Sequence, residues 1–406
     1  MQQRIYLSAP DLTGAEFEYV KAAFETNWVA PVGPNLTRFE EAVAGIVGKK
    51  HAVALTSGTA AMHLALKYVG IGPGDVVLCS DLTFSGSCNP IYYEGAEAVF
   101  VDSEADSWNM SPAALESAIR HETARGKKPK AVIIVNLYGQ SADMDTLMMI
   151  CRAYGIPVVE DAAESLGACY KGRPSGSFGD FTVVSFNGNK IVTTSSGGML
   201  LSDDSHAIEK CRFWSTQSRE PAVHYEHREI GYNYRLSNVL AGIGLGQLEQ
   251  LPLKIERRKS FYMEYRKALS DLGQVTMMPI PLWSEPNYWL TTLTLSSDSP
   301  VSPIQLIECL AELNIESRPV WKPMHMQPVF AGTRYYTDAA VYISGEVKES
   351  VNRTEASSSP FVLSDSISED LYARGVCLPS GTKMSNEDQD RVIHAVRTCL
   401  LAGGCQ

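Results

Sequence analysis

The chain has 406 residues, of which 45% are hydrophobic, and its formal net charge is -11 at pH 7. This length and apolar content suffice for one large hydrophobic core and a second, smaller one. The acidic balance disfavours contact with nucleic acid phosphates and anionic membrane surfaces, so we expect no nucleic acid and no membrane as partners.

The first half of the chain alternates short apolar runs with helical segments. Residues 59–68 have helical periodicity, and residues 151–154 close another helix. Strands are predicted at 51–55, 75–79, 98–102, 131–136, 156–160, 181–186 and 198–202. This alternation predicts an α/β fold with a mostly parallel central sheet flanked by helices.

The pattern changes near residue 250, where we expect a domain boundary. Residues 238–269 predict a long helical stretch, residues 289–295 a strand and residues 304–313 a helix. We therefore expect a large domain over residues 1–250 and a smaller α+β C-terminal domain over 251–406. Residues 333–370 are rich in Ser, Thr, Glu and Asp, which predicts a long surface loop.

The sequence contains neither a recognisable targeting signal nor a disulfide pattern. The N-terminus has no apolar signal core, and no apolar run is long enough to span a bilayer. Nine scattered cysteines without a CxxC pair favour reduced thiols over a disulfide framework. Together these features predict a cytoplasmic protein.

Polar segments follow three of the predicted strands, and ligands bind at the carboxyl ends of strands in open parallel sheets. Residues 56–59 (TSGT) follow the first strand and precede a helix. The free N–H groups at a helix N-terminus bind a phosphate dianion, although an ordinary N-cap explains the same hydroxyls.

Asp161 follows the strongly apolar strand at 156–160. A carboxylate at a buried strand end needs a partner to offset its desolvation. A protonated pyridine nitrogen is one such partner, because the nearby anion keeps the nitrogen cationic and the ring then withdraws electrons. A helix N-cap aspartate would explain the position equally well.

Lys190 follows the strand at 181–186 through a turn that contains a glycine. Most lysines are solvated surface charges, but one beside apolar strands suits Schiff-base chemistry. Each of these three signals is weak alone. Their order along the chain, a phosphate cup, a ring acid and then a lysine, is the order of a pyridoxal 5'-phosphate (PLP) site.

Several other motifs favour structural roles. The run GIGLG at 242–246 lacks the dinucleotide-binding spacing and predicts close helix packing. His224 and His227 have no further ligands at metal spacing, so no metal is expected. Trp283, Tyr288 and Trp289 are expected in the core.

Four segments resemble the DegT/DnrJ/EryC1/StrS family of sugar aminotransferases. They are TSGTAAMHLAL (56–66), VVEDAAESLGA (158–168), SFNGNKIVTTSSGGML (185–200) and GYNYRLSN (231–238). The resemblance spans nearly the whole chain and implies the PLP-dependent transferase fold type I. Segments 213–220, 224–238, 316–325 and 375–385 are similar to the UDP-N-acetylbacillosamine transaminases within this family. That likeness implies transfer of an amino group from L-glutamate to C4 of UDP-4-keto-6-deoxy-N-acetylglucosamine.

The resemblance also implies a role for each matching residue. Lys190 carries the cofactor covalently, and Asp161 meets its pyridine nitrogen. The other implied cofactor contacts are Phe84 on the ring, Glu164 near the phenolic oxygen, and Gly58, Thr59 and Ser185 at the phosphate. Asn233 reaches the phosphate of the partner subunit's cofactor, which implies a homodimer with shared sites. The implied substrate positions are Asn27, Trp28, Arg235, Arg318 and His325.

Three questions stay open at this point: the substrate, the amino donor and the class of protein. The substrate could be another nucleotide-linked keto sugar, with a C3 or isomeric C4 ketone or with dTDP or GDP as the nucleotide. The amino donor is not determined by the sequence. A nonenzymatic PLP-binding regulator is a different class, but the chain has no helix-turn-helix pattern or basic stripe.

Overall fold

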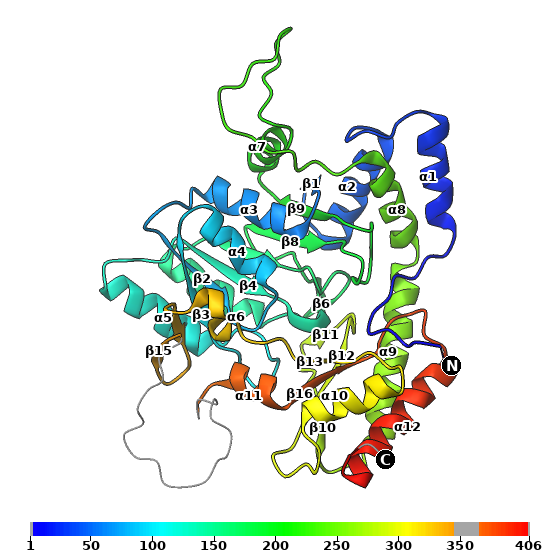
Figure 1. Ribbon diagram of the computed structural model, residues 1–406. Coiled ribbons are helices and arrows are strands. Elements are labelled where there is room, and N and C mark those ends of the chain that lie inside the picture. Colours follow the sequence, from blue (N-terminus) through cyan, green and yellow to red (C-terminus); the bar gives the residue numbers. More distant parts are fainter. Residues whose placement is uncertain (1–2, 345–364, 405–406) are drawn as a thin grey trace.

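The computed structural model describes residues 3–344 and 365–404. A nine-stranded sheet with the order β1-β9-β8-β5-β4-β2-β3-β14-β15 forms its centre (Figure 1). The bounds are β1 His51–Leu55, β2 Val76–Ser80, β3 Glu97–Val101, β4 Ala131–Val135, β5 Val158–Asp161, β8 Phe181–Ser185, β9 Gly198–Ser202, β14 Arg334–Tyr336 and β15 Val341–Ile343. β14, β3, β2, β4, β5 and β8 pair in parallel, whereas β9 and β15 pair antiparallel with their neighbours.

Helices cover both faces of this sheet, as the alternating pattern predicts. α3 (Gly58–Val69), α4 (Ser85–Tyr93) and α7 (Ser205–Ser215) pack on one face. On the other face, α5 (Pro112–Ala124) and α6 (Met144–Tyr154) cover one end, and α2 (Pro34–Val47) and α8 (Asn238–Glu249) cover the other. Because both faces are covered, strands such as β2 and β4 are buried along their whole length.

The helical stretch expected over 238–269 consists of two helices, α8 and α9 (Leu251–Ala268). The break falls at Gln250, because Pro252 fits the first turn of a new helix and not the interior of a continuous one. The glycines of α8 permit close packing against α2 and α1 (Ala15–Glu25). A Cβ atom on Gly246 would lie 2.5 Å from the Glu16 backbone nitrogen, which agrees with the predicted packing role.

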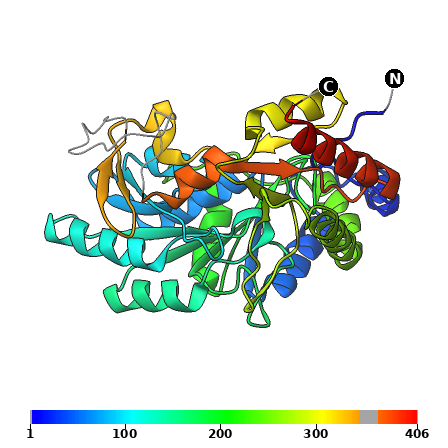
Figure 2. The same ribbon diagram turned by 90° about the horizontal axis from the view of Figure 1, so that it is seen from below.

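The C-terminal half builds a second sheet with the order β10-β12-β16-β13. Its strands are β10 (Val275–Met277), β12 (Thr291–Leu295), β16 (Gly375–Leu378) and β13 (Arg318–Pro319). α9, α10 (Pro303–Glu312) and α12 (Asn386–Ala402) share its core. Figure 2 shows α10 and α12, in yellow and red, on one side of the molecule and the cyan α5 on the other. The boundary near residue 250 remains a prediction.

Short elements complete the described chain. β6 (Cys169–Tyr170), β7 (Arg173–Pro174) and β11 (Ser284–Glu285) form a three-stranded sheet. The 3-10 helices are η1 (Leu137–Gly139), η2 (Met324–Met326) and η3 (Pro328–Phe330). The segment between α7 and α8 extends away from the body at the top of Figure 1.

The prediction of a surface loop over residues 333–370 is wrong for most of the residues in this range that the structure describes. β14 pairs in parallel with β3, and Tyr335 and Tyr336 are only 0% and 1% exposed. The polar composition misled the prediction because Arg334 is buried against the carboxylate of Glu122. β15 and α11 (Ile367–Arg374) add further regular structure. The remaining residues of the expected loop, 345–364, lie outside the described residues.

Two expectations from composition can be compared with the described residues. In that part of the chain, no helix combines the length and the apolarity needed to cross a membrane. Seven cysteines there are free thiols, whereas Cys309 is disulfide-bonded. The expectation of reduced thiols is therefore wrong at Cys309.

Candidate active site

The polar segments that follow β1, β2, β5 and β8 meet at one edge of the central sheet. Lys190 Nζ, beyond β8, lies 3.5 Å from Glu164 Oε1, beyond β5. Ser87 Oγ, in the helix after β2, lies 2.7 Å from Asp161 Oδ2, at the end of β5. A Cβ atom on Gly58, after β1, would lie 3.3 Å from Ser185 Cβ at the end of β8.

Lys190 lies in a turn that its backbone N–H closes by donating to the Asn187 carbonyl at 3.0 Å. Its side chain is only 12% exposed. Nζ faces the Trp289 ring, 4.0 Å from the ring centroid. The amine therefore lies between a carboxylate and an aromatic face and not in open solvent.

Asp161 is buried and has two hydrogen-bond donors. Ser87 Oγ donates at 2.7 Å and the Ala163 backbone N–H at 3.0 Å. Burial raises the pKa of Asp161, while these two donors and the charge of Lys190 act to lower it. A cationic ring nitrogen would be a third group that stabilises the carboxylate, so Asp161 fits the predicted role of ring acid.

Glu164 is buried beside Lys190 and accepts a hydrogen bond at 2.7 Å from the Tyr138 backbone N–H. Burial raises the pKa of Glu164, and Lys190 and the Tyr138 N–H act in the opposite direction. Tyr138 has a φ of 53°, a left-handed conformation that is rare for a bulky residue. Strained backbone of this kind concentrates at functional sites, and here it points an N–H at Glu164.

The segment at 56–59 begins α3. Ser57 Oγ accepts a hydrogen bond from the Ala60 N–H at 3.0 Å, so this hydroxyl is an N-cap. Thr59 lies beside α4, since its Oγ1 would be 3.0 Å from a Cβ atom on Gly86. Gly58, Thr59 and Ser185 are thus neighbours at a helix N-terminus, a favourable place for a phosphate. Their contact with the cofactor phosphate remains a prediction.

Two further predicted cofactor contacts are exposed. Phe84 immediately precedes α4 and is 67% exposed, so its ring is available to stack on a ligand. Asn233 is also exposed and lies between Tyr232 and Tyr234, whose rings stack on each other at 4.8 Å. Because side chains alternate along an extended segment, Asn233 points away from these rings.

A cleft of about 610 Å³ adjoins the lysine turn. Arg318 is 59% exposed in this cleft, where Glu316 holds its guanidinium at 2.9 Å. The sequence prediction missed one wall, the N-terminal segment. The other residues that line the cleft are Tyr6, Leu7, Ser8, Ala9, Pro10, Gly188, Asn189, Trp289, Leu290 and Trp321.

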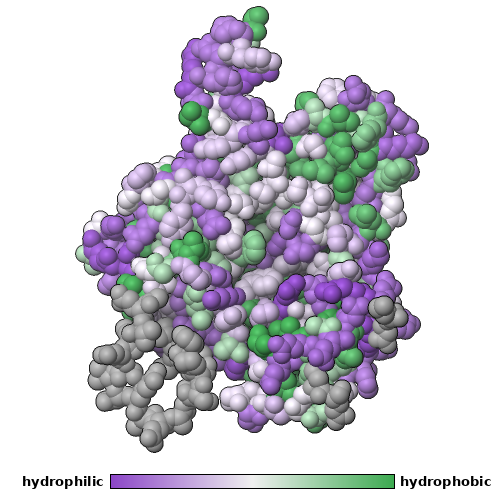
Figure 3. Space-filling model, in the orientation of Figure 1, coloured by the Kyte–Doolittle hydropathy of each residue, from purple (hydrophilic) through white to green (hydrophobic). Residues whose placement is uncertain are grey.

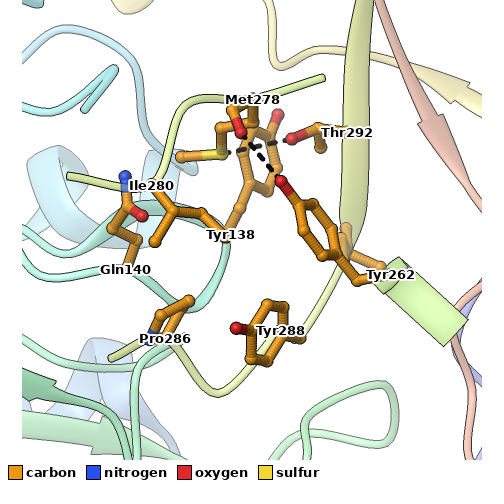
Figure 4. Close-up of a pocket in the computed structure, with 9 residues that line it drawn as sticks. Tyr138, Gln140, Tyr262, Met278, Ile280, Pro286, Tyr288 and Thr292 are labelled. Carbon is orange, nitrogen blue, oxygen red and sulfur yellow. Dashed lines mark hydrogen bonds between the residues drawn. The ribbon is translucent and has the colours of Figure 1, made fainter. Parts of the chain in front are cut away.

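A second cavity lies beside Tyr138, between the loop after β4 and the C-terminal sheet (Figure 4). Tyr262, whose hydroxyl donates to the Met278 carbonyl at 3.3 Å, forms one wall. Its volume of about 20 Å³ has room for about one water molecule. The larger cleft is therefore the candidate substrate site.

The structure gives Arg235 a different environment from the one expected. Its guanidinium is buried and donates to Glu40 and, at 2.8 Å, to the Ala54 carbonyl. Arg212 binds the same carboxylate at 3.0 Å. Arg235 thus joins α2 and β1, and the structure does not bring its charge to the cleft.

His325 is likewise buried away from the position expected of a substrate contact. Its Nδ1 lies 2.8 Å from Asp81 Oδ2, its Nε2 lies 2.9 Å from Glu369 Oε1, and its ring stacks on Tyr335. Burial lowers the pKa of His325, but the two carboxylates raise it to about 9. Both ring nitrogens are used inside the protein, so His325 is a structural cation.

Asn27 and Trp28 lie in the exposed loop between α1 and α2. The Trp28 carbonyl accepts a hydrogen bond at 2.7 Å from Asn238 Nδ2, which ties this loop to α8. No interaction among the described residues connects the two side chains to Lys190. Their contact with substrate remains a prediction.

The histidines expected not to bind metal have other partners. His224 Nε2 lies 3.1 Å from Glu226 Oε2, and His227 Nδ1 lies 2.8 Å from the Gln217 carbonyl. Across residues 3–344 and 365–404, no group of three or more His, Cys, Asp or Glu side chains could hold a metal ion.

The fold and this constellation define a PLP-dependent transferase of fold type I. PLP requires a lysine for its aldehyde, an anion for its ring nitrogen and a cradle for its phosphate. Lys190, buried Asp161 and the N-terminus of α3 lie at one sheet edge and fit these three requirements, and their contact with the cofactor remains a prediction.

Comparisons with known proteins identify the family. The sequence profile of the DegT/DnrJ/EryC1/StrS aminotransferase family matches residues 10–353. The Bacillus subtilis protein EpsN is 51% identical over 98% of this chain and 96% of its own length. GDP-perosamine synthase of Caulobacter vibrioides is 40% identical over 81% of this chain and 87% of that protein. A Streptococcus pneumoniae protein solved in its PLP form is 25% identical, with a TM-score of 0.82 over 99% of this chain and 100% of that one. The chain belongs to the DegT/DnrJ/EryC1/StrS family and is a PLP-dependent sugar aminotransferase.

Proposed function

We propose that the enzyme transfers an amino group from L-glutamate to C4 of UDP-4-keto-6-deoxy-N-acetylglucosamine, which yields the UDP-linked 4-amino sugar. The observation that supports this proposal is the cleft beside the turn that contains Lys190. It combines an exposed cation, Arg318, with the aromatic side chain of Trp321. An arginine suits a diphosphate through paired hydrogen bonds, and an aromatic face suits a pyrimidine base.

In this proposal the protein residues position the cofactor and move protons. Bound PLP supplies an electrophilic carbon and an electron-withdrawing ring. Asp161 would stabilise the positive charge on the ring nitrogen, and Glu164 would lie near the phenolic oxygen. The Lys190 amine takes the Cα proton of glutamate in the first half-reaction and delivers a proton to C4 of the sugar in the second. One base can serve both transfers because the same turn fixes its position.

We also propose a homodimer in which Asn233 binds the phosphate of the partner subunit's cofactor. Exposed apolar side chains gather on and beside α1, where Figure 3 shows a green surface. These residues are Leu12, Phe17, Phe24, Trp28, Val29 and Val32. An apolar patch of this kind supports a protein–protein interface. Asn27 and Trp28 would then lie at the subunit boundary.

A GDP-linked 4-keto sugar is the second candidate substrate. It is favoured by the similarity to the GDP-perosamine synthase of Caulobacter vibrioides. The two candidates share the ketone chemistry at Lys190 and differ in the base that the cleft must hold. For either substrate we propose a cytoplasmic location. The seven free thiols among the described cysteines support this location, whereas the disulfide bond at Cys309 does not.

A substrate panel tests the proposal. The enzyme is incubated with PLP, nitrogen-15 glutamate and equal concentrations of UDP-, GDP- and dTDP-linked 4-keto-6-deoxy sugars, and the products are analysed by mass spectrometry. We expect the label in the UDP-linked N-acetylated amino sugar first. Faster labelling of the GDP sugar would replace the UDP proposal with the second candidate.

A further inference from the structure

Lys190 Nζ lies between two buried groups that both favour a positive charge. Glu164 Oε1 is 3.5 Å from Nζ, and the Trp289 ring centroid is 4.0 Å from it. Trp289 is 1% exposed and Glu164 is also buried, so water competes little for the amine. A carboxylate and the face of an indole each bind ammonium in preference to a neutral amine.

Both groups are held firmly in place. The Tyr138 N–H fixes Glu164 at 2.7 Å, and Trp289 Nε1 donates to the Asn189 carbonyl at 2.8 Å. A single buried side chain, Asn287, connects them. Its Nδ2 donates to the Glu164 carbonyl at 2.9 Å, and its Oδ1 accepts from the Trp289 N–H at 2.8 Å.

This connection requires a specific backbone. A Cβ atom on Gly139 would lie 2.1 Å from Asn287 Oδ1 and 2.8 Å from the Trp289 backbone nitrogen. Gly139 also has a φ of 99°, which favours glycine. The loop after β4 thus holds Glu164 through Tyr138 and leaves room for Asn287 through Gly139.

We propose that Glu164 and Trp289 form a binding site for the ammonium form of Lys190 during proton transfer. The inference rests on the proposed function, in which Lys190 acts as a free base in each half-reaction. Nζ forms an N–H bond as the substrate C–H bond breaks, and it returns that proton to carbon in the next step. No proton is gained or lost overall, and the site stabilises Lys190 while it carries the proton.

The site also explains why two buried carboxylates, Glu164 and Asp161, lie near the cofactor position. Glu164 is the anion next to Nζ, whereas Asp161 has its own donors, Ser87 and Ala163. Each of the two buried carboxylates therefore has a different cation to stabilise. Trp289 adds an attractive face without an additional negative charge near Asp161.

The first test measures the reactivity of Lys190 in the full-length chain freed of PLP. The chain is labelled briefly with a trace of acetic anhydride, and peptide mass spectrometry compares Lys190 with exposed Lys21 in the same sample. Only the neutral amine reacts, so loss of an ammonium-stabilising group should speed labelling of Lys190. We expect roughly threefold to tenfold faster labelling in Glu164→Gln and in Trp289→Leu.

Matched variants separate this role from general damage. Trp289→Phe keeps an aromatic face and should label at nearly the wild-type rate. Glu316→Gln removes a carboxylate from the adjoining cleft that is paired with Arg318, and it should leave Lys190 labelling unchanged. Circular dichroism verifies folding of each variant. Wild-type labelling in Glu164→Gln would overturn the proposal even if Trp289→Leu does not fold.

The second test uses the complete enzyme with glutamate deuterated at Cα. In Glu164→Gln and Trp289→Leu, proton transfer should become slower, and the isotope effect on kcat should exceed that of the wild type. Trp289→Phe should restore the wild-type effect. An unchanged isotope effect in both damaged variants would contradict the proposal. Because labelling needs no sugar, an incorrect substrate would leave the first test intact.

Discussion

Replacement of Ser87 by alanine should lower the rate of the glutamate half-reaction, and the loss should be largest at low pH. Ser87 Oγ donates to Asp161 Oδ2 at 2.7 Å, and both side chains are buried. Burial already raises the pKa of Asp161, and the Ser87 hydroxyl opposes that rise. Ser87→Ala should therefore raise the pKa of Asp161 further, so that less of it is ionised on the acidic side of the profile.

The size of the effect follows from the hydrogen bond. A bond to a charged group contributes about 1.5–3 kcal/mol, which corresponds to roughly a tenfold to hundredfold change in the ionised fraction. At low pH, where protonated Asp161 dominates in the variant, the glutamate half-reaction should slow by about that factor. At high pH, where Asp161 is ionised in both proteins, the difference should shrink.

Single-turnover measurements of the glutamate half-reaction across pH provide the assay. Ser87→Thr keeps a hydroxyl and should retain most of the rate at low pH. Thr83→Val removes a hydroxyl 2.8 Å from Ser87 Oγ but keeps the bond to Asp161, so its profile should change little. If the rate falls at the same low pH in Ser87→Ala as in the wild type, the Ser87 hydroxyl does not lower the pKa of Asp161.

Three other predictions concern the cleft, the subunits and the buried histidine. Arg318→Ala should raise the KM of the sugar at least about tenfold and spare the glutamate half-reaction, whereas equal damage to both would contradict a role in the cleft. Mixing Lys190→Ala with Asn233→Ala subunits should recover activity above either parent if sites are shared; no recovery after verified exchange would place Asn233 in its own subunit's site. The pKa of His325 is raised from 6.5 to about 9, so its stabilising contribution is complete below pH 6.5 and is lost as the pH rises through 9. Urea unfolding at about pH 6 and pH 9.5 should differ by up to about 3 kcal/mol in wild type and by less in His325→Gln, and equal differences would exclude His325 as the cause.

Much of the central sheet could be predicted because its signal is local. Each buried parallel strand is a short apolar run, and 198–202 is predicted with the bounds that β9 has. The carboxyl ends of such strands share one edge of the sheet, so the proximity of Asp161 and Lys190 could be predicted from strand order, whereas Glu164 was implied only by the family resemblance.

Features that depend on distant partners could not be predicted in this way. β14 joins the sheet by pairing with β3, far earlier in the chain, and it lies in a range, 333–370, whose Ser, Thr, Glu and Asp content is typical of a loop. The single signal for burial there was two adjacent tyrosines. The burial of His325, which the resemblance implied to be a substrate position, could not be predicted because its partners, Asp81 and Glu369, come from two distant elements.

Trp289 illustrates a different limit of the sequence prediction. It was expected in the core and is indeed buried, yet its ring also faces Lys190 Nζ. Burial follows from composition, whereas the neighbour that a ring faces depends on how the C-terminal sheet packs on the first one. The Tyr6–Pro10 wall of the cleft was missed for the same reason.

Reductive trapping of the cofactor tests the central assignment most directly. The enzyme loaded with PLP is reduced with borohydride and digested, and the pyridoxyl group is located by peptide mass spectrometry. We expect the modification on Lys190, the lysine beside Glu164 and Trp289. Stoichiometric modification of another lysine, with Lys190 unmodified, would contradict it.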